Sequence, residues 1–298
     1  MWYNDLNSPL QSVEDETLVK AGVMLWIKRD DLIHPQISGN KWRKLKHNIA
    51  AAKKQHLETI LTFGGAFSNH IAATAAAGQE FNIKTIGIIR GEATTPLNPT
   101  LSFATACGME IHYLDRTSYR KKETASLIKD LKNKFEAFWL IPEGGCNNEG
   151  AKGCEEIVSE IDINFEYICC PCGTATTISG ISQALKSHQK VLGFPALKGG
   201  AFLKDTIQAL STKENYLLFN DYHFGGYAKY KPQLIDFITH FKKTHGIQLD
   251  PIYTGKMMYG LYDLIAKGYF KKGTKIIAVH TGGLQGIDGF NKRYKTNL

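Results

Sequence analysis

The chain has 298 residues, of which 43% are hydrophobic and 21% charged, which is ordinary for a globular protein and long enough for two α/β lobes. No apolar run reaches the roughly 18 residues of a membrane span, and Met1–Asn7 lacks the basic and apolar regions of a signal peptide, so we expect a cytoplasmic protein with no membrane partner. The net charge of +8 is mixed with acidic residues and accompanies no recognised binding motif, so we expect no nucleic-acid partner.

Strand-like and helix-like segments alternate along the chain. In chain order, the predicted elements are strand 59–63, helix 69–79, strand 85–89, helix 99–107, strand 110–114, helix 119–135, strand 137–141, helix 148–161, strand 167–170, helix 176–187 and strand 275–280. Strands that alternate with helices of about ten or more residues predict an α/β fold with mostly parallel sheets.

The cysteines predict buried, reduced thiols. Cys169 and Cys172 form a C-x-x-C pattern, which also occurs in redox and zinc sites. No second pair follows at metal-ligand spacing, and the run Tyr167–Cys172 is typical of the end of a buried strand. We therefore expect no metal site.

Short loops of small and polar residues follow four of the predicted strands. They are Gly64–Asn69, Pro142–Asn147, Gly173–Thr177 and Thr281–Gly283. In parallel sheets, ligands bind beyond the carboxyl ends of the strands and beside helix N-termini. A turn alone explains one or two such loops, whereas four at one edge predict a ligand site.

The loop Gly173-Thr174-Ala175-Thr176-Thr177 is a candidate phosphate site. It joins a strand to a helix, where backbone N–H groups, hydroxyls and the helix dipole favour an anion. It is neither a P-loop nor a dinucleotide-binding loop, because no Gly-Lys-Ser/Thr follows and Ala175 replaces the second glycine. The equally weighted alternative is a strand–helix turn with a threonine cap and no ligand.

Lys41 lies where the loop Ser38–Asn40 is expected to become a helix. The positive end of the helix disfavours an ammonium there, which lowers the pKa of the lysine and frees its amine for imine chemistry. Lys44, one turn later, is placed to reach a phosphate. The alternative is a basic helix start without a ligand, which the helix dipole makes unfavourable.

Several segments together resemble a known family. They are, in order, Lys28–Leu32, Ser38–Leu45, Gly64–His70, Pro142–Asn147, Gly173–Gly180, Asp250–Lys256 and His280–Gly283. This pattern resembles the fold-type II pyridoxal 5′-phosphate (PLP) enzymes related to 1-aminocyclopropane-1-carboxylate (ACC) deaminase and D-cysteine desulfhydrase. The resemblance covers nearly the whole chain, and the segment around Lys41 together with Gly-Gly-x-x-Ser-Asn is its specific part.

The resemblance implies a two-lobed, three-layer αβα fold with mostly parallel sheets, like the β subunit of tryptophan synthase. A small lobe of residues 45–135 is expected to be inserted in a large PLP-binding lobe of residues 1–44 and 136–298, with PLP in the cleft. Family members are typically homodimers, so the resemblance also implies a homodimer.

The resemblance assigns cofactor contacts to residues in four segments. Lys41 matches the lysine that carries PLP as a Schiff base, and Lys44 with the Gly173–Thr177 loop matches the phosphate contacts. Asn69 matches the asparagine beside the phenolic oxygen of the ring. Thr254 stands where the family places the partner of the pyridine nitrogen.

The phosphate loop departs from the family at Ala175 and Thr176, where fold-type II loops often have glycine. A Cβ atom at these positions restricts the approach of the backbone. Either the Thr176 hydroxyl compensates for this or the phosphate binds in a slightly different position.

Three further residues match groups around the substrate. Ser68 matches the serine near the substrate carboxylate and Cα, and Tyr227 and Tyr253 match two tyrosines. Each has a structural alternative, because Ser68 is also a helix cap and buried tyrosines are common in cores. The shared order of the motifs favours the active site.

The resemblance implies an enzyme that forms a carbanion at Cα of a small amino acid, with PLP as the electron sink, and releases ammonia and a 2-keto acid. D-cysteine desulfhydration is the leading prediction, and ring opening of ACC is the alternative. The alternative from another class is a non-catalytic PLP-binding protein, which would need neither Ser68 nor the two tyrosines.

Thr254 bears on the choice between the two substrates. ACC deaminases have glutamate in the corresponding Tyr-Glu-Gly-Lys segment, whereas this chain has Tyr253-Thr-Gly-Lys256. A neutral hydroxyl stabilises a pyridinium less than a carboxylate does, so we expect a less protonated ring nitrogen and a weaker electron sink. Sulfide leaves readily, because a thiol ionises near a pKa of about 8.5, and the threonine therefore favours D-cysteine.

Overall fold

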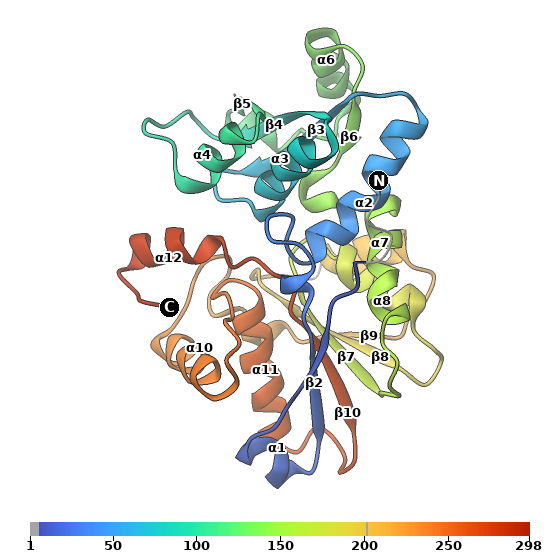
Figure 1. Cartoon of the computed structure of the whole chain (residues 1–298), viewed down its shortest axis with the longest axis vertical. Coiled ribbons are helices and arrows are strands. Elements are labelled where there is room, and N and C mark those ends of the chain that lie inside the picture. Colours follow the sequence, from blue (N-terminus) through green and yellow to red (C-terminus); the bar gives the residue numbers. More distant parts are fainter. Residues whose placement is uncertain (1–5, 201) are drawn as a thin grey trace.

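Two β-sheets organise the chain into two lobes, which lie one above the other along its longest axis (Figure 1). The computed structural model describes residues 6–200 and 202–298, so the interpretation of Met1–Asn7 falls largely outside the described residues. Each sheet has helices on both faces, which confirms the two-lobed, three-layer αβα fold. Within the described ranges, no helix is both long enough and apolar enough to span a membrane.

The larger sheet has six strands in the order β1-β2-β10-β7-β8-β9. Their bounds are β1 Leu10–Val13, β2 Met24–Lys28, β7 Tyr167–Cys172, β8 Lys190–Pro195, β9 Tyr216–Leu218 and β10 Lys275–Val279. All pairs are parallel except β1 with β2 at one edge. The central strands β7 and β10 are apolar along nearly their whole length because helices cover both of their faces.

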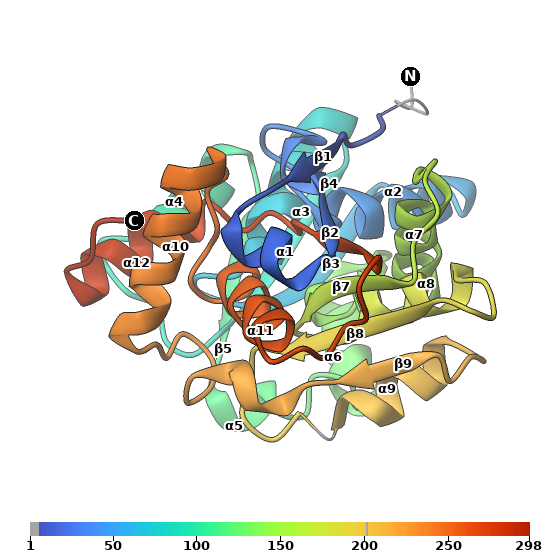
Figure 2. The same cartoon turned by 90° about the horizontal axis from the view of Figure 1, so that it is seen from below.

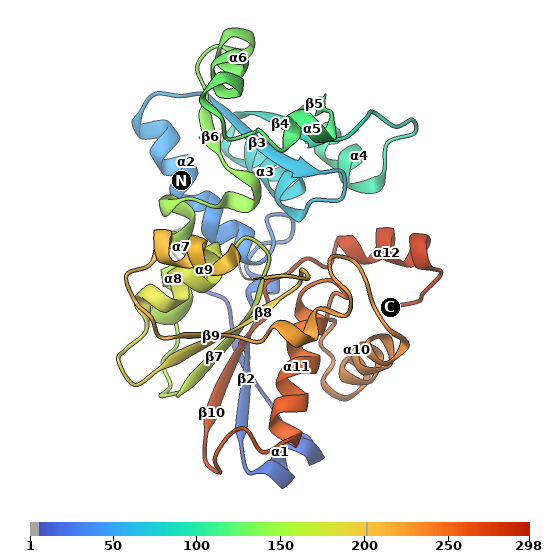
Figure 3. The same cartoon turned by 180° about the vertical axis from the view of Figure 1, so that it is seen from behind.

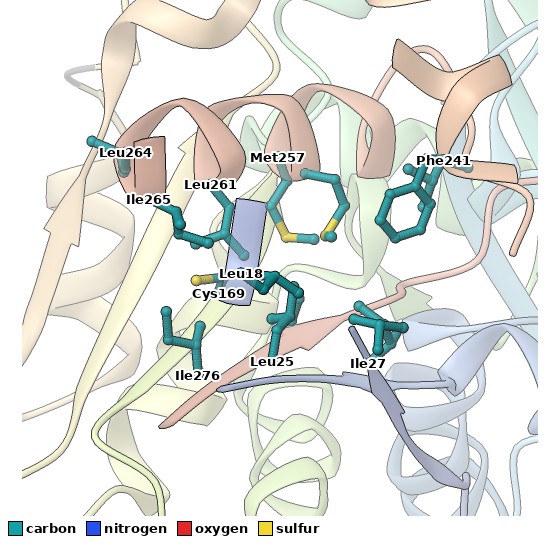
Figure 4. Close-up of a cluster of buried hydrophobic side chains, with 14 of the residues drawn as sticks. Leu18, Leu25, Ile27, Cys169, Phe241, Met257, Leu261, Leu264, Ile265 and Ile276 are labelled. Carbon is teal, nitrogen blue, oxygen red and sulfur yellow. The ribbon is translucent and has the colours of Figure 1, made fainter. Parts of the chain in front are cut away.

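Helices cover both faces of the larger sheet (Figures 2 and 3). One face has α1 Glu16–Ala21, α10 Pro232–His245 and α11 Thr254–Ala266, and the other has α7 Asn148–Ser159, α8 Thr176–Ala184 and α9 Phe202–Leu210. Figure 4 shows the first face, where Met257 and Leu261 of α11 lie over Leu25 and Ile276 of the sheet. Burying each such side chain stabilises the fold by roughly 1.5–3 kcal/mol.

The smaller sheet has four parallel strands in the order β5-β4-β3-β6. Their bounds are β3 Thr59–Gly65, β4 Lys84–Arg90, β5 Glu110–Leu114 and β6 Trp139–Ile141. One face has α2 Asn40–Lys54, α3 Asn69–Phe81 and α4 Pro99–Ala106, and the other has α5 Arg116–Tyr119 and α6 Ala125–Phe135. Because β6 pairs with β3, this sheet extends beyond residue 135, the expected end of the small lobe.

Three 3-10 turns and a final helix connect or follow these elements. They are η1 Asp30–Leu32, η2 Glu143–Gly145, η3 Asn220–His223 and α12 Gly286–Tyr294. In Figure 1, α12 lies at the side of the molecule, at a height between the smaller sheet and the larger sheet.

The prediction of one continuous helix over 119–135 is wrong. A turn at residues 120–124 separates α5 from α6. Thr124 has the extended backbone of an N-cap, with φ −73° and ψ 142°, and threonine favours this position over a helix interior. The other predicted strands and helices are present, with ends that differ by about three residues or fewer.

The C-x-x-C pattern is part of a strand, because Cys169 and Cys172 both lie in β7. These two and their neighbours Cys154 and Cys170 are buried, and all are free thiols. The prediction of buried thiols is confirmed for these four, whereas the remaining two cysteines, also free, are only partly buried.

A buried ion cluster around Arg43 fixes the first turns of α2. The guanidinium bonds Asp30 of η1, with Nη2 2.9 Å from Oδ1, and also bonds both carboxylate oxygens of Glu160 at the end of α7. Lys28 of β2 adds a second cation, with Nζ 2.7 Å from Oε2 of Glu160. Gly153 brings α7 close to α2, since a Cβ there would lie only 1.9 Å from the carbonyl oxygen of Arg43.

We predict that Arg43→Met lowers the free energy of unfolding by about 3–5 kcal/mol, because it leaves the buried carboxylate of Asp30 and the partly buried carboxylate of Glu160 without their main partner. Urea unfolding followed by circular dichroism measures this change. Lys46→Met is the matched control on the same helix, since its partly exposed pair with Glu156 contributes about 1 kcal/mol or less. Equal effects of the two substitutions would contradict a special role for the Arg43 cluster.

Candidate active site

The loops that follow β3, β6, β7 and β10 meet between the two lobes. A Cβ on Gly144, after β6, would lie 2.7 Å from Cγ2 of Thr174, after β7. A Cβ on Gly283, after β10, would lie 2.9 Å from Nδ2 of Asn69, after β3. The four loops singled out in the sequence therefore contact one another in pairs across the lobes, and each pair joins one loop of the smaller sheet to one loop of the larger sheet. The carboxyl ends of the strands of both sheets thus face the same region.

Lys41 is the second residue of α2, at the predicted loop–helix boundary. The preceding Gly39 has φ 68°, and a Cβ there would lie 1.9 Å from the carbonyl oxygen of Thr281, so only glycine fits. Lys41 Nζ donates to Oδ1 of Asn40 at 2.8 Å, and Asn40 Nδ2 donates to Oγ1 of Thr177 at 2.7 Å. Asn40 thus connects the lysine to the start of α8.

Two lysines on this part of α2 are held in an environment that disfavours their charge. Burial, with a smaller contribution from nearby Lys44, lowers the pKa of Lys41 to about 7, and Cys154 and Asp250 partly oppose this. Burial also lowers the pKa of Lys44, whose Nζ donates to the carbonyl oxygen of Gly144 at 3.0 Å. The lowered pKa favours the free, nucleophilic amine form of Lys41 near neutral pH.

The Gly173–Thr177 loop forms a compact turn at the start of α8. Ala175 has a left-handed backbone with φ 63°, a conformation that glycine adopts at little cost, which explains why glycine is common in such loops. The hydroxyls of Thr174 and Thr176 lie 3.2 Å apart. Cys146 Sγ donates to the carbonyl oxygen of Thr174 at 3.2 Å, which ties the loop to the smaller lobe.

Ser68 and Asn69 stand at the start of α3. Ser68 is the helix cap that the sequence suggested, because its Oγ accepts hydrogen bonds from the backbone N–H groups of His70, at 3.2 Å, and Ile71, at 3.3 Å. These bonds occupy the oxygen lone pairs and leave its hydrogen for another acceptor. Asn69 Oδ1 accepts from Nε2 of Gln285 at 3.4 Å, so this amide faces the segment that leads into α12.

Tyr227 and Tyr253 form a pair beside the phosphate loop. Their ring centroids are 6.3 Å apart in an edge-to-face arrangement, and Tyr253 lies against Gly173, whose Cβ would be 3.2 Å from Cε1 of the ring. Tyr227 is 43% exposed, which argues against a pure core role. Burial and the neighbouring Tyr227 hold the pKa of Tyr253 well above its ordinary value, so its hydroxyl stays a hydrogen-bond donor.

Lys256 holds the loop that carries Tyr227. Its side chain is 1% exposed, and Nζ donates to the backbone carbonyls of His223 and Gly226, both at 2.8 Å. Burial lowers the pKa of Lys256 to about 8. Sequence reasoning gave this lysine no role, although it belongs to the Asp250–Lys256 motif.

Thr254 is fully buried at the start of α11. Its Oγ1 donates to Oδ1 of Asp250 at 2.7 Å and accepts from the backbone N–H of Asp250 at 2.9 Å. Asp250 in turn lies beside Gly283, whose Cβ would be 3.6 Å from its Cγ. Sequence reasoning missed Asp250 and Asn40. The signal for both was their place in the motifs, since Asn40 directly precedes Lys41 and Asp250 begins the segment that ends at Lys256.

The family model described as "Pyridoxal-phosphate dependent enzyme" matches residues 4–282. The chain belongs to this family of PLP-dependent enzymes. It is 33% identical to the mitochondrial bifunctional D-cysteine desulfhydrase/ACC deaminase of Arabidopsis thaliana, over 89% of this chain and 74% of that protein. The crystal structure of an ACC deaminase homologue superposes with a TM-score of 0.85 at 28% identity, covering 96% of this chain and 92% of that one.

A more distant likeness concerns the fold alone. A hydrogen sulfide-producing enzyme from Fusobacterium nucleatum has a TM-score of 0.69 with this chain at 18% identity, with coverage of 94% and 97%. The fold is therefore shared by proteins whose sequences have diverged widely.

The residues between the lobes of this PLP-dependent enzyme fit its cofactor. An ammonium donates three hydrogen bonds, and within the described residues Lys44 has one acceptor, the carbonyl of Gly144. Nδ1 of the neighbouring His70 is buried, and it has no hydrogen-bond partner among the described residues. A buried cation with free donors, two threonine hydroxyls and a helix start are the groups that bind a phosphate ester.

The lowered pKa of Lys41 predicts the pH dependence of cofactor attachment. The rate at which apoprotein reacts with PLP should rise roughly tenfold per pH unit below about pH 7 and level off above about pH 8, because the free-amine form then predominates. Stopped-flow absorbance of PLP measures this rate. Nα-acetyllysine is the control, since its ordinary pKa of about 10.4 keeps its rate rising, and the same continued rise for the protein would contradict the prediction.

Proposed function

We propose that this PLP-dependent enzyme deaminates a small amino acid, with D-cysteine as the preferred substrate. Elimination of sulfide and addition of water convert D-cysteine to pyruvate, hydrogen sulfide and ammonia. The choice of substrate rests on the hydroxyl of Thr254. ACC deaminases have a carboxylate at the corresponding position. The name of the Arabidopsis relative, which includes both activities, supports the reaction class.

The cofactor roles follow from the positions of the side chains. Lys41 is the proposed attachment residue, because burial lowers the pKa of its amine to about 7 and the residue lies at the start of α2. Lys44 and the Gly173–Thr177 loop would bind the phosphate, and Asn69 would hold the phenolic oxygen of the ring. Bound PLP withdraws electrons from Cα of an attached amino acid, which makes the Cα proton acidic.

The remaining site residues act on the substrate. The amine of Lys41 is the base for the Cα proton, and the Ser68 hydroxyl, whose hydrogen the helix cap leaves free, binds the substrate carboxylate and assists that transfer. Tyr227 and Tyr253 keep their protons and orient the substrate on the side of the phosphate loop. A PLP-binding protein without catalysis would require neither this serine nor the tyrosine pair.

The two candidate substrates differ in the bond that must break. A thiol ionises near a pKa of about 8.5, so sulfide leaves from the β-carbon at modest cost. ACC requires cleavage of a ring C–C bond, which demands more electron withdrawal by the cofactor. A hydroxyl next to the ring nitrogen stabilises positive charge less than a directly bonded carboxylate does, and this favours D-cysteine.

ACC deamination, which gives 2-oxobutanoate and ammonia, is the second candidate. The structural similarity to an ACC deaminase homologue over 96% of the chain favours it.

We further propose that the protein is a homodimer, as the family resemblance implies. Light scattering of the purified protein measures its oligomeric state.

We predict that the purified holoenzyme has a kcat/KM for D-cysteine at least about tenfold above that for ACC, a difference of about 1.4 kcal/mol in transition-state stabilisation. Sulfide and keto-acid assays measure the two rates, with L-cysteine as the control for chirality. Thr254→Glu should shift the ratio towards ACC, and Thr254→Ser should preserve it. Efficient turnover of ACC by the wild-type enzyme, with D-cysteine left unchanged, would overturn the proposed substrate.

A further inference from the structure

The carboxylate of Asp250 is enclosed by hydrogen-bond donors. Oδ2 accepts from the backbone N–H groups of Ile252, at 2.8 Å, and Tyr253, at 2.9 Å. Oδ1 accepts from the backbone N–H of Thr254 at 2.8 Å and from its hydroxyl at 2.7 Å. Three of these four donors are backbone N–H groups, which cannot accept, so the pattern is that of an ionised, acceptor-only carboxylate.

This arrangement fixes the direction of the Thr254 hydroxyl. Its hydrogen is committed to Asp250, and one of its two oxygen lone pairs takes the backbone N–H of Asp250 at 2.9 Å. One lone pair remains. Towards any third group, Thr254 is therefore an acceptor and not a donor.

The Asp250–Thr254 pair lies next to two of the loops that form the candidate site. Gly283 lies between Asp250 and Asn69, since a Cβ on this glycine would be 3.6 Å from Cγ of the aspartate and 2.9 Å from Nδ2 of the asparagine. The residue before Thr254, Tyr253, contacts Gly173 of the phosphate loop. Asp250 is 2% exposed, so water screens its charge little.

We propose that Asp250, acting through the Thr254 hydroxyl, keeps the pyridine nitrogen of bound PLP protonated. This role rests on the proposed position of Thr254 at that nitrogen. A ring nitrogen that pairs with an acceptor must itself supply the hydrogen, and the carboxylate behind the hydroxyl polarises it and stabilises the positive ring. Asp250 is thus a positioning residue that raises the protonation of the ring nitrogen without contacting the cofactor.

The expectation of a less protonated ring nitrogen is revised accordingly, because the hydroxyl of Thr254 is not an isolated neutral group. The charge of Asp250 lies one hydrogen bond further from the ring than a direct carboxylate would. The resulting electron withdrawal is intermediate, greater than with an unsupported hydroxyl and smaller than with glutamate. That order agrees with a preference for the substrate with the better leaving group.

The test is nitrogen NMR of holoenzyme loaded with PLP that carries ¹⁵N in the ring, since the chemical shift separates pyridinium from neutral pyridine without substrate. We expect a pyridinium signal in the wild type and in Thr254→Ser, which retains the hydroxyl. Thr254→Val, of nearly the same shape, should give the neutral pyridine signal. Asp250→Asn should also shift the signal towards the neutral form, because Thr254 keeps its hydrogen-bond acceptor but loses the charge.

Several outcomes would overturn the proposal. A neutral ring nitrogen in the wild type would show that Thr254 donates to it, and a pyridinium signal that persists in Thr254→Val would show that the path does not pass through this hydroxyl. If Asp250→Asn does not fold, the wild type and the two Thr254 variants still decide between these results. Failure of the proposed substrate leaves the NMR result unaffected, because the measurement requires bound PLP but no turnover.

Discussion

The buried bonds from Arg43 to Asp30 and Glu160 are the constraint on which the site depends. Three basic residues, Lys41, Arg43 and Lys44, occupy the first turns of α2, where the helix dipole disfavours positive charge. Arg43 is neutralised by two carboxylates from other segments, and these bonds hold α2 against η1 and α7. The two lysines obtain no such partner within the described residues. Their lowered pKa values therefore follow from the position that Arg43 imposes on the helix.

The charges of the site are separated along the cofactor-binding region. The free cationic donor of Lys44 lies beside the loops after β6 and β7, where a phosphate supplies the missing negative charge. The carboxylate of Asp250 lies near Gly283 and Asn69, and in our proposal a protonated ring nitrogen would supply positive charge there. A single zwitterionic ligand such as PLP complements both groups. This complementarity explains why buried charges that would be costly in an empty core are tolerated here.

Much of the fold and the membership of the site could be predicted from the sequence, because both rest on local patterns. Alternating strands and helices fix the parallel sheets, and parallel sheets bring the loops after their strands to one edge. Lys41 was recognised because a lysine at a helix start is unfavourable without a chemical reason. The break at Thr124 was missed because a threonine in a basic, polar segment is compatible with either a helix interior or a cap.

Other features could not be predicted, because they depend on tertiary contacts. Asn40 and Thr177 are 137 positions apart in the sequence, and only the packing of α2 beside α8 joins them. The bond between Asp250 and Thr254 is local, but its consequence for a ring nitrogen depends on which lone pair remains free.

The central claim is that the start of α2 presents one amine, that of Lys41, for covalent attachment of PLP. It is tested most directly by reducing the holoenzyme with borohydride, digesting it and mapping the labelled lysine by mass spectrometry. The account predicts a single label on the peptide that contains Lys41, and Lys41→Ala should yield no labelled peptide. A label on Lys44, Lys256 or any other lysine of the wild-type protein would contradict it.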